Sequence, residues 1–301
     1  MVRLNHLFAP LGLLFISATV SGGPLKVVCT DANLADIAKH VGGNRVRVEC
    51  LIRGTDDPHQ VEPRPSMVVK LASADLFVRI GMDLDMYADA LLERCGNRKV
   101  QRGGPGYVDA SHGIKALEVP TSKVDPSMGD IHVYGNPHYL LDPANGLVAA
   151  SKVTAGLIRV DPGGAQEYRQ NLARFERRLQ EAMARWKDAM KGLSGKPIVV
   201  YHKTWAYFAR RFKLVEFGAI EPKPGVPPSP GHVQGLIRSM KSQNVPIVLC
   251  ETFRSRRYPD MIASQTGARA VYVPIAVGGS PEAQDYFSLF DVIVSRIASA
   301  G

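Results

Sequence analysis

The sequence predicts an α/β protein with two lobes, each built on a parallel β-sheet, and one long helix that joins them. Short β-branched segments alternate with helical segments in both halves of the 301-residue chain. Such alternation is typical of parallel sheets that are covered by helices on both faces. Between the halves, residues 166–191 carry apolar side chains three or four positions apart, which predicts a single amphipathic helix.

The first half is predicted to contain four strands and four helices. Asp31 has a side chain suited to cap the first helix, and the glycines at 42 and 43 end that helix. The strands are expected at 25–30, 45–52, 75–80 and 107–110, and the helices at 31–41, 66–73, 86–94 and 144–159.

The second half repeats this pattern after the long helix. Its strands are expected at 198–201, 215–219, 246–250 and 270–274, and its helices at 204–211, 232–244, 258–266 and 286–297. Ligands of open α/β sheets bind beyond the carboxyl ends of the strands, and two such edges that face each other form a cleft. We therefore divide the chain into residues 1–23, an N-terminal lobe at 24–163, the joining helix at 164–193 and a C-terminal lobe at 194–301.

The net charge of +9 suggests nucleic acid as a partner, but the distribution of the basic residues along the chain argues against this interpretation. No dense Lys/Arg stripe is interleaved with aromatic residues. The densest basic runs, residues 174–178 and 254–257, are interpreted as solvated surfaces. We expect no nucleic-acid partner.

The N-terminus has the pattern of a secretory signal peptide. Arg3 precedes an apolar run at 7–20, and the small residues Ser21, Gly22 and Gly23 follow it. The run is short for a membrane span, and no cysteine that could carry a lipid follows it. A buried N-terminal helix is the alternative. We expect a soluble protein exported to the periplasm.

The four cysteines, Cys29, Cys50, Cys95 and Cys250, form no C-x-x-C pair that would predict a cysteine zinc site. Export permits disulfides. Because Cys29 and Cys50 lie in successive predicted strands, a bridge between them and a pair of buried free thiols are both open.

Three histidines lie next to predicted strands or helices. His59 and His138 each follow a proline, and His202 directly follows a strand. Proline stiffens the backbone, and rigid placement suits a metal ligand, because zinc binds imidazole nitrogen at about 2.0–2.1 Å. A single histidine at a strand end is nevertheless more often a hydrogen-bonded or surface residue. The residues alone leave both interpretations open.

Five segments, in order along the chain, resemble one known family. They are similar to motifs of the zinc and manganese solute-binding proteins of ABC importers, the cluster A-I family. The segments are Gly54–Ser66, Ala74–Asp85, Asn136–Pro143, Tyr168–Leu172 and Val200–Phe208.

The resemblance implies a rigid interdomain helix and a metal site in the cleft between the lobes, with His59, His138 and His202 as ligands. Manganese members carry a carboxylate at the third position, so His202 favours Zn²⁺ over Mn²⁺ as the bound solute. The resemblance further implies a monomeric, non-enzymatic protein that captures zinc and delivers it to the permease subunits of an ABC importer. Exchange with a periplasmic metallochaperone stays open.

The sequence departs from the family pattern at the fourth ligand. Many members supply an aspartate after the last strand, but residues 272–279 contain no carboxylate here. Water, Glu251 or Asp285 are the alternatives, and a structural role for Glu251 is equally open. The family's histidine-rich loop is also missing: His132 is the one histidine between 120 and 135, and we expect it to be solvent-exposed. Glu62 and Asp142 are candidate hydrogen-bond partners of the imidazoles.

Three alternatives come from other functional classes. The first alternative is an exported zinc hydrolase with Glu251 as general base, because three histidines and a water also form a catalytic zinc site. A manganese or iron carrier is the second, and an adhesin of the same family is the third.

Overall fold

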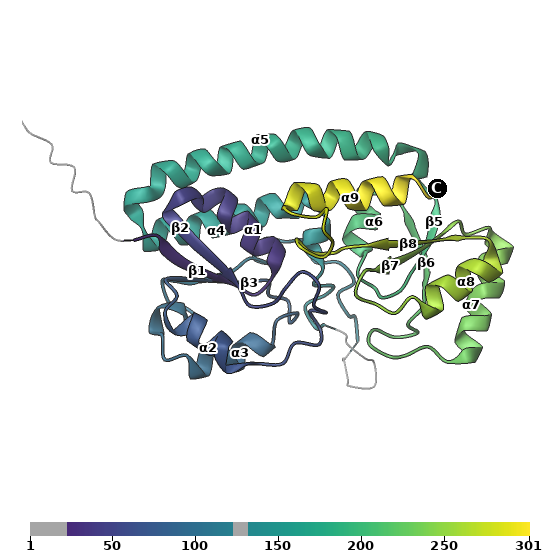
Figure 1. Ribbon diagram of the computed structural model, residues 1–301, viewed down its shortest axis with the longest axis horizontal. Coiled ribbons are helices and arrows are strands. Elements are labelled where there is room, and N and C mark those ends of the chain that lie inside the picture. Colours follow the sequence, from purple (N-terminus) through teal and green to yellow (C-terminus); the bar gives the residue numbers. More distant parts are fainter. Residues whose placement is uncertain (1–22, 123–131) are drawn as a thin grey trace, which may run out of the picture.

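The protein consists of two α/β lobes side by side, with helix α5 along both (Figure 1). The computed structural model describes residues 23–122 and 132–301. Each lobe holds one four-stranded, all-parallel sheet, with strand orders β2-β1-β3-β4 and β6-β5-β7-β8. The predicted fold class is therefore confirmed. The predicted signal peptide lies outside the described residues except for Gly23.

All the predicted strands and helices are present, and their ends differ from prediction by about two residues at most. The N-terminal lobe contains β1 (Leu25–Cys29), α1 (Ala32–Gly42), β2 (Val46–Cys50), α2 (Pro65–Ala72), β3 (Leu76–Arg79), α3 (Tyr87–Arg94), β4 (Tyr107–Asp109) and α4 (Pro143–Val160). The C-terminal lobe contains β5 (Pro197–Val200), α6 (Ala206–Phe212), β6 (Val215–Ala219), α7 (Pro230–Gln243), β7 (Ile247–Glu251), α8 (Arg257–Thr266), β8 (Arg269–Val273) and α9 (Tyr286–Ala298).

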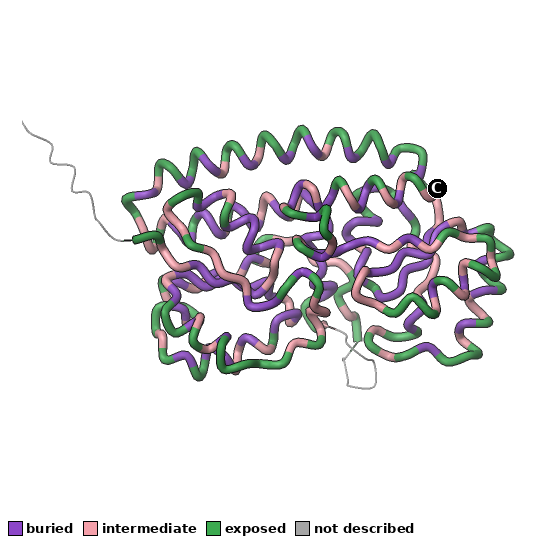
Figure 2. The backbone as a smooth tube through the Cα atoms, viewed as in Figure 1, coloured by how far each residue is buried: buried purple, intermediate pink, exposed green. Residues whose placement is uncertain are grey.

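Helix α5 (Ala165–Ala189) packs on α1 and α4 of the first lobe and on α9 of the second. Its buried side chains form one stripe, while its opposite face is exposed (Figure 2). The two ends of the helix are fixed by hydrogen bonds to different lobes. Asn171 Nδ2 donates to Val41 O at 3.0 Å, and Trp186 Nε1 donates to Asp291 Oδ1 at 2.7 Å. The helix thus acts as a strut between the lobes.

The main hydrophobic core runs through both lobes, and each lobe has a smaller apolar cluster of its own. The main core includes Val27 and Leu76 of the first sheet, Ile198 and Leu249 of the second, and Phe175 of α5. Buried or partly buried hydrogen bonds also cross from lobe to lobe, listed here by donor and acceptor: Asn33 Nδ2 to Ile275 O (3.0 Å), Val277 N to Asn33 Oδ1 (2.9 Å), and Tyr286 N to Asp36 Oδ2 (2.9 Å). Apolar contact and paired polar groups together hold the lobes in one arrangement.

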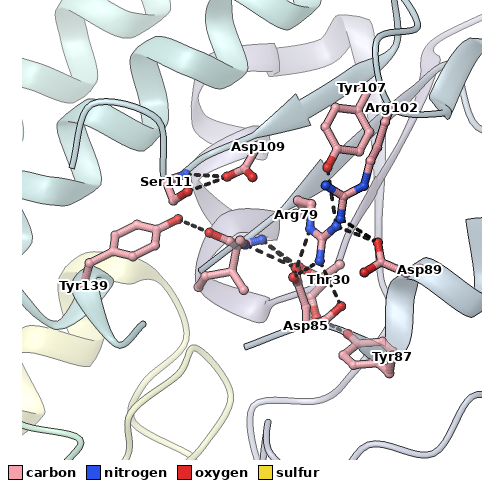
Figure 3. Close-up of polar contacts among 12 residues, drawn as sticks. Thr30, Arg79, Asp85, Tyr87, Asp89, Arg102, Tyr107, Asp109, Ser111 and Tyr139 are labelled. Carbon is pink, nitrogen blue, oxygen red and sulfur yellow. Dashed lines mark hydrogen bonds and ion pairs between the residues drawn. The ribbon is translucent and has the colours of Figure 1, made fainter. Parts of the chain in front are cut away.

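A buried ion-pair network closes the turn after β3 (Figure 3). Asp85 Oδ1 accepts from Arg79 Nε at 3.0 Å and from Nη2 at 2.8 Å, while Oδ2 accepts from Thr30 Oγ1 and from Ile80 N, both at 2.7 Å. Arg79 also pairs with Asp89 at 2.8 Å. The side chains of Arg79 and Asp85 are 3% and 2% exposed. A buried charge is tolerated only when it is paired and hydrogen-bonded in this way.

The cysteines are free thiols in the structure. Cys29 and Cys50 are register partners in β1 and β2. Burial raises the pKa of the Cys50 thiol to about 12 and also raises that of Cys29. Since the thiolate is the reactive form, both thiols are weak nucleophiles at neutral pH. Within the described residues, no helix combines the length and apolar character that a bilayer crossing requires.

Candidate metal site

The three predicted histidines meet in the cleft between the lobes. His59 lies in the loop after β2, His138 immediately precedes a 3₁₀ turn at Tyr139–Leu141, and His202 follows β5. The Nε2 atoms of His59 and His138 are 3.1 Å apart, and one ring nitrogen from each of the three histidines lies within 4.8 Å of the others. Ligand nitrogens around a tetrahedral zinc ion are about 3.3 Å apart, given metal–nitrogen distances of 2.0–2.1 Å. The geometry therefore suits one small ion.

Local turns fix the backbone of two of these histidines. His59 N–H donates to Asp57 Oδ1 at 3.0 Å, and His138 N–H donates to Asn136 Oδ1 at 3.0 Å. In both cases the acceptor side chain lies two residues before the histidine and a proline lies between, so the turn is stiff. Asn136 also reaches the other lobe, because its Nδ2 donates to Lys203 O at 2.7 Å.

His202 is oriented by a carboxylate. Its Nδ1 lies 2.7 Å from Glu221 Oε2, which also accepts the N–H of Gly225 at 2.8 Å. Although burial alone would raise the pKa of Glu221, the hydrogen bonds from His202 and Gly225 bring it below its ordinary value. An ionised Glu221 holds the proton of His202 on Nδ1 and leaves Nε2 available to bind a metal.

The carboxylates suggested as imidazole partners lie elsewhere, so that prediction is wrong. Asp142 caps α4 through the N–H of Ala144 and pairs with Arg211, with Oδ1 2.6 Å from Arg211 Nε. Glu62 is exposed. The sequence did contain a signal for Glu221. His202 and Glu221 follow β5 and β6, which are neighbours in the sheet, so their side chains meet at its carboxyl edge.

Burial keeps two of the imidazoles neutral. The pKa of both His59 and His138 lies well below the usual 6.5, first because burial disfavours the charged ring and second because the other imidazoles stand close. Only a neutral imidazole can bind a metal. Both rings are therefore in the binding form at neutral pH.

The structure does not bring the suggested fourth ligands into the group of three. Glu251 is fully buried at the end of β7, where Oε1 accepts from Trp205 Nε1 at 2.9 Å; its Oε2 has no hydrogen-bond partner among the described residues. Asp285 caps α9 through the N–H of Ser288 and pairs with Arg178 at 3.1 Å. Asp285 thus has structural contacts away from the imidazoles, whereas Glu251 contacts Trp205 and is near enough to His202 to interact with it electrostatically.

Two residues lie closer to the site than expected. His132 is half-buried with its ring centroid 5.4 Å from that of His59, so the expectation of a solvent-exposed side chain is wrong. Arg254, interpreted as part of a solvated basic run, has a side chain only 13% exposed and pairs with Asp57 and Glu221. It follows β7, the other neighbour of β5, which is the signal that could have placed it beside His202.

A cavity of about 120 Å³ adjoins His138 and His202. Its other walls include Glu118, His132 and Lys203. Pockets for organic ligands are usually about 300–1,000 Å³. The cavity suits a hydrated ion and gives no support to the hydrolase alternative, which needs room for an organic substrate.

The chain is similar to known metal-uptake proteins over nearly its whole length. A family model described as the periplasmic component A of the zinc-uptake complex matches residues 27–300. The high-affinity zinc uptake system protein ZnuA of Bacillus subtilis (strain 168) is 25% identical over 272 residues, 89% of this chain and 84% of that one. The manganese ABC transporter substrate-binding lipoprotein PsaA of Streptococcus pneumoniae is 24% identical over 288 residues, 94% and 90% of the two chains.

A crystal structure of ZnuA has the same architecture. Its TM-score is 0.76 at 26% sequence identity, and the match covers 92% of this chain and 99% of that one. The parallel sheets, the long connecting helix and the family match agree. The chain belongs to the zinc-uptake component A family, the metal-binding substrate-binding proteins of ABC transporters.

Proposed function

We propose that this protein captures Zn²⁺ in the periplasm and delivers it to the permease of an ABC importer. The observation that carries the proposal is the convergence of three imidazole nitrogens from separate segments of the chain. The first and last of these residues, His59 and His202, are 143 positions apart in sequence. Imidazole donors suit zinc, whereas manganese sites are richer in carboxylates. The names of the relatives include both zinc and manganese, so we base the choice of zinc on the three imidazole ligands.

In this proposal His59, His138 and His202 bind the ion and a water from the adjoining cavity takes the fourth position. Glu251 is the protein alternative at that position, since one of its oxygens has no partner among the described residues. The lobes correspond to residues 24–163 and 194–301, and the protein acts as a monomer. A metallochaperone that exchanges zinc with it is compatible with the open cavity.

Metal content tests the proposal directly. The mature chain, stripped of metal and dialysed against equal concentrations of Zn²⁺ and Mn²⁺, is expected to retain one equivalent of zinc, measured by plasma mass spectrometry. Preferential retention of manganese would contradict the zinc assignment, and retention of neither metal would contradict the site itself.

Zinc affinity is expected to fall by no more than about tenfold per pH unit between pH 7.5 and 6.5 and more steeply at lower pH. The folded-state pKa values of His59 and His138 are depressed, so at these two ligands protons compete with zinc only below the ordinary imidazole range. For the same reason the contribution of these two imidazoles to the stability of the metal-free protein is fully present above pH 6.5 and declines as the pH falls below it.

Competition with a chelator whose own proton binding is known would measure the affinity at each pH. A loss of affinity steeper than about tenfold per pH unit between 7.5 and 6.5 requires more than one imidazole to take up a proton and would contradict the depressed pKa values.

A further inference from the structure

We infer that Arg254 is a positioning residue that links the two metal-binding loops across the cleft and slows the release of bound metal. The inference rests on the proposed function, because it concerns the same site. It goes further by naming a residue that is not one of the three proposed ligands and by assigning it to the rate of release.

Arg254 completes a chain of contacts from one lobe to the other. Its Nη1 lies 3.3 Å from Asp57 Oδ2 and 3.5 Å from Glu221 Oε1. The other oxygen of Asp57 accepts the N–H of His59, and the other oxygen of Glu221 contacts His202 Nδ1. The loop that carries His59 and the ring of His202 are therefore connected through protein atoms alone.

The guanidinium is held in place from several sides. Its side chain is 13% exposed, and its carbon Cζ lies 5.6 Å from the ring centre of Tyr201 and 5.4 Å from that of Phe253. The N–H of Arg254 donates to Glu251 O at 3.1 Å, which fixes the backbone at the end of β7. Ordering and desolvating a cation carries a large cost unless it is paired, and here both lobes supply the pairing carboxylates.

Two effects of this cation on a divalent ion oppose each other. Its charge repels the ion, but Asp57 and Glu221 carry two compensating negative charges, so the repulsion is largely cancelled. Its contacts fix the carboxylates that place His59 and His202, and hydrogen-bonded partners of this kind typically contribute about 10- to 100-fold to metal affinity. Positioning is therefore the larger effect.

The test is the rate at which zinc leaves the protein. In stopped-flow mixing of the zinc-loaded full chain with a chromogenic chelator, Arg254→Met is expected to release zinc up to about 10-fold faster than the wild type, the lower end of the effect of direct ligand partners, because Arg254 acts through Asp57 and Glu221. Arg254→Lys, which keeps the charge, is expected to restore part of the difference. The matched control is Arg256→Met, because Arg256 is exposed and stacks on Tyr272 away from the site.

Three further measurements separate the outcomes. The visible absorption of the Co²⁺-loaded protein reports ligand geometry and is expected to change in Arg254→Met but not in Arg256→Met. Asp57→Asn combined with Arg254→Met is expected to release zinc little faster than Arg254→Met alone, because the two residues act in one chain of contacts. Circular dichroism verifies that each variant is folded.

Release at the wild-type rate, or slower release, from a folded Arg254→Met variant would overturn the inference. Slower release would show that charge repulsion dominates. If Arg254→Met does not fold, the rate from Arg254→Lys decides, because faster release is still expected. A wild-type protein that binds no zinc would instead refute the proposed function, so the two failures are distinguishable.

Discussion

His138→Ala is expected to weaken zinc binding by about 100- to 1,000-fold. Structural zinc sites supply about 10–16 kcal/mol of binding free energy from four ligands, so one ligand contributes about 3–4 kcal/mol, and each 1.4 kcal/mol is tenfold in affinity. His138 is 6% exposed and its Nε2 is 3.1 Å from that of His59, so its loss removes a buried donor from the centre of the site.

Isothermal titration with a competing chelator measures this loss. His112→Ala is the matched control, because His112 is exposed and lies outside the group of three imidazoles. An His138→Ala protein that still binds one zinc ion with wild-type affinity would remove His138 from the site.

Asp85→Ala is expected to lower the free energy of unfolding of the metal-free protein by about 3–5 kcal/mol. The substitution leaves the buried guanidinium of Arg79 without its buried, two-point partner and removes the acceptor for Thr30 Oγ1 and Ile80 N. Breaking a buried pair costs this much because the remaining charge stays desolvated, and here only the half-exposed Asp89 still pairs with it. Few single substitutions have an effect of this size.

Urea denaturation followed by circular dichroism gives the change in unfolding free energy. Asp89→Ala is the matched control: Asp89 contacts the same guanidinium, but its side chain is 40% exposed, so the expected loss is about 1 kcal/mol or less. Equal losses for the two variants would show that burial does not determine the strength of this network.

The strands and helices could be predicted because each is specified locally. The alternating valines at 46 and 48 and the three-to-four spacing of apolar residues along α5 depend on near neighbours in the chain, and Asp31 caps α1 with its own side chain, as predicted. The backbone at His59 and His138 is likewise held by residues close by in the chain, the preceding proline and an acceptor side chain two residues before the histidine.

The partners of the imidazoles could not be predicted in the same way. Glu221 is 19 residues from His202 in sequence, and Arg254 is farther, so their contacts depend on the order of strands in the second sheet. The sequence indicates that Glu221 and Arg254 each follow a strand, but it does not by itself fix which strands are neighbours in the sheet. Local motifs suggested Glu62 and Asp142, which are near the histidine motifs in the chain but do not orient a ring in the fold.

The hydrophobic core that the two lobes share limits how the protein can evolve. In proteins built from separable domains, each part has its own interior and can be exchanged, inserted or lost independently. Here each lobe has a smaller apolar cluster of its own, but the main core combines side chains of both lobes and of α5. A fragment with only one lobe would expose part of this core to water. The two lobes are therefore expected to be inherited together, and neither can be lost or exchanged alone.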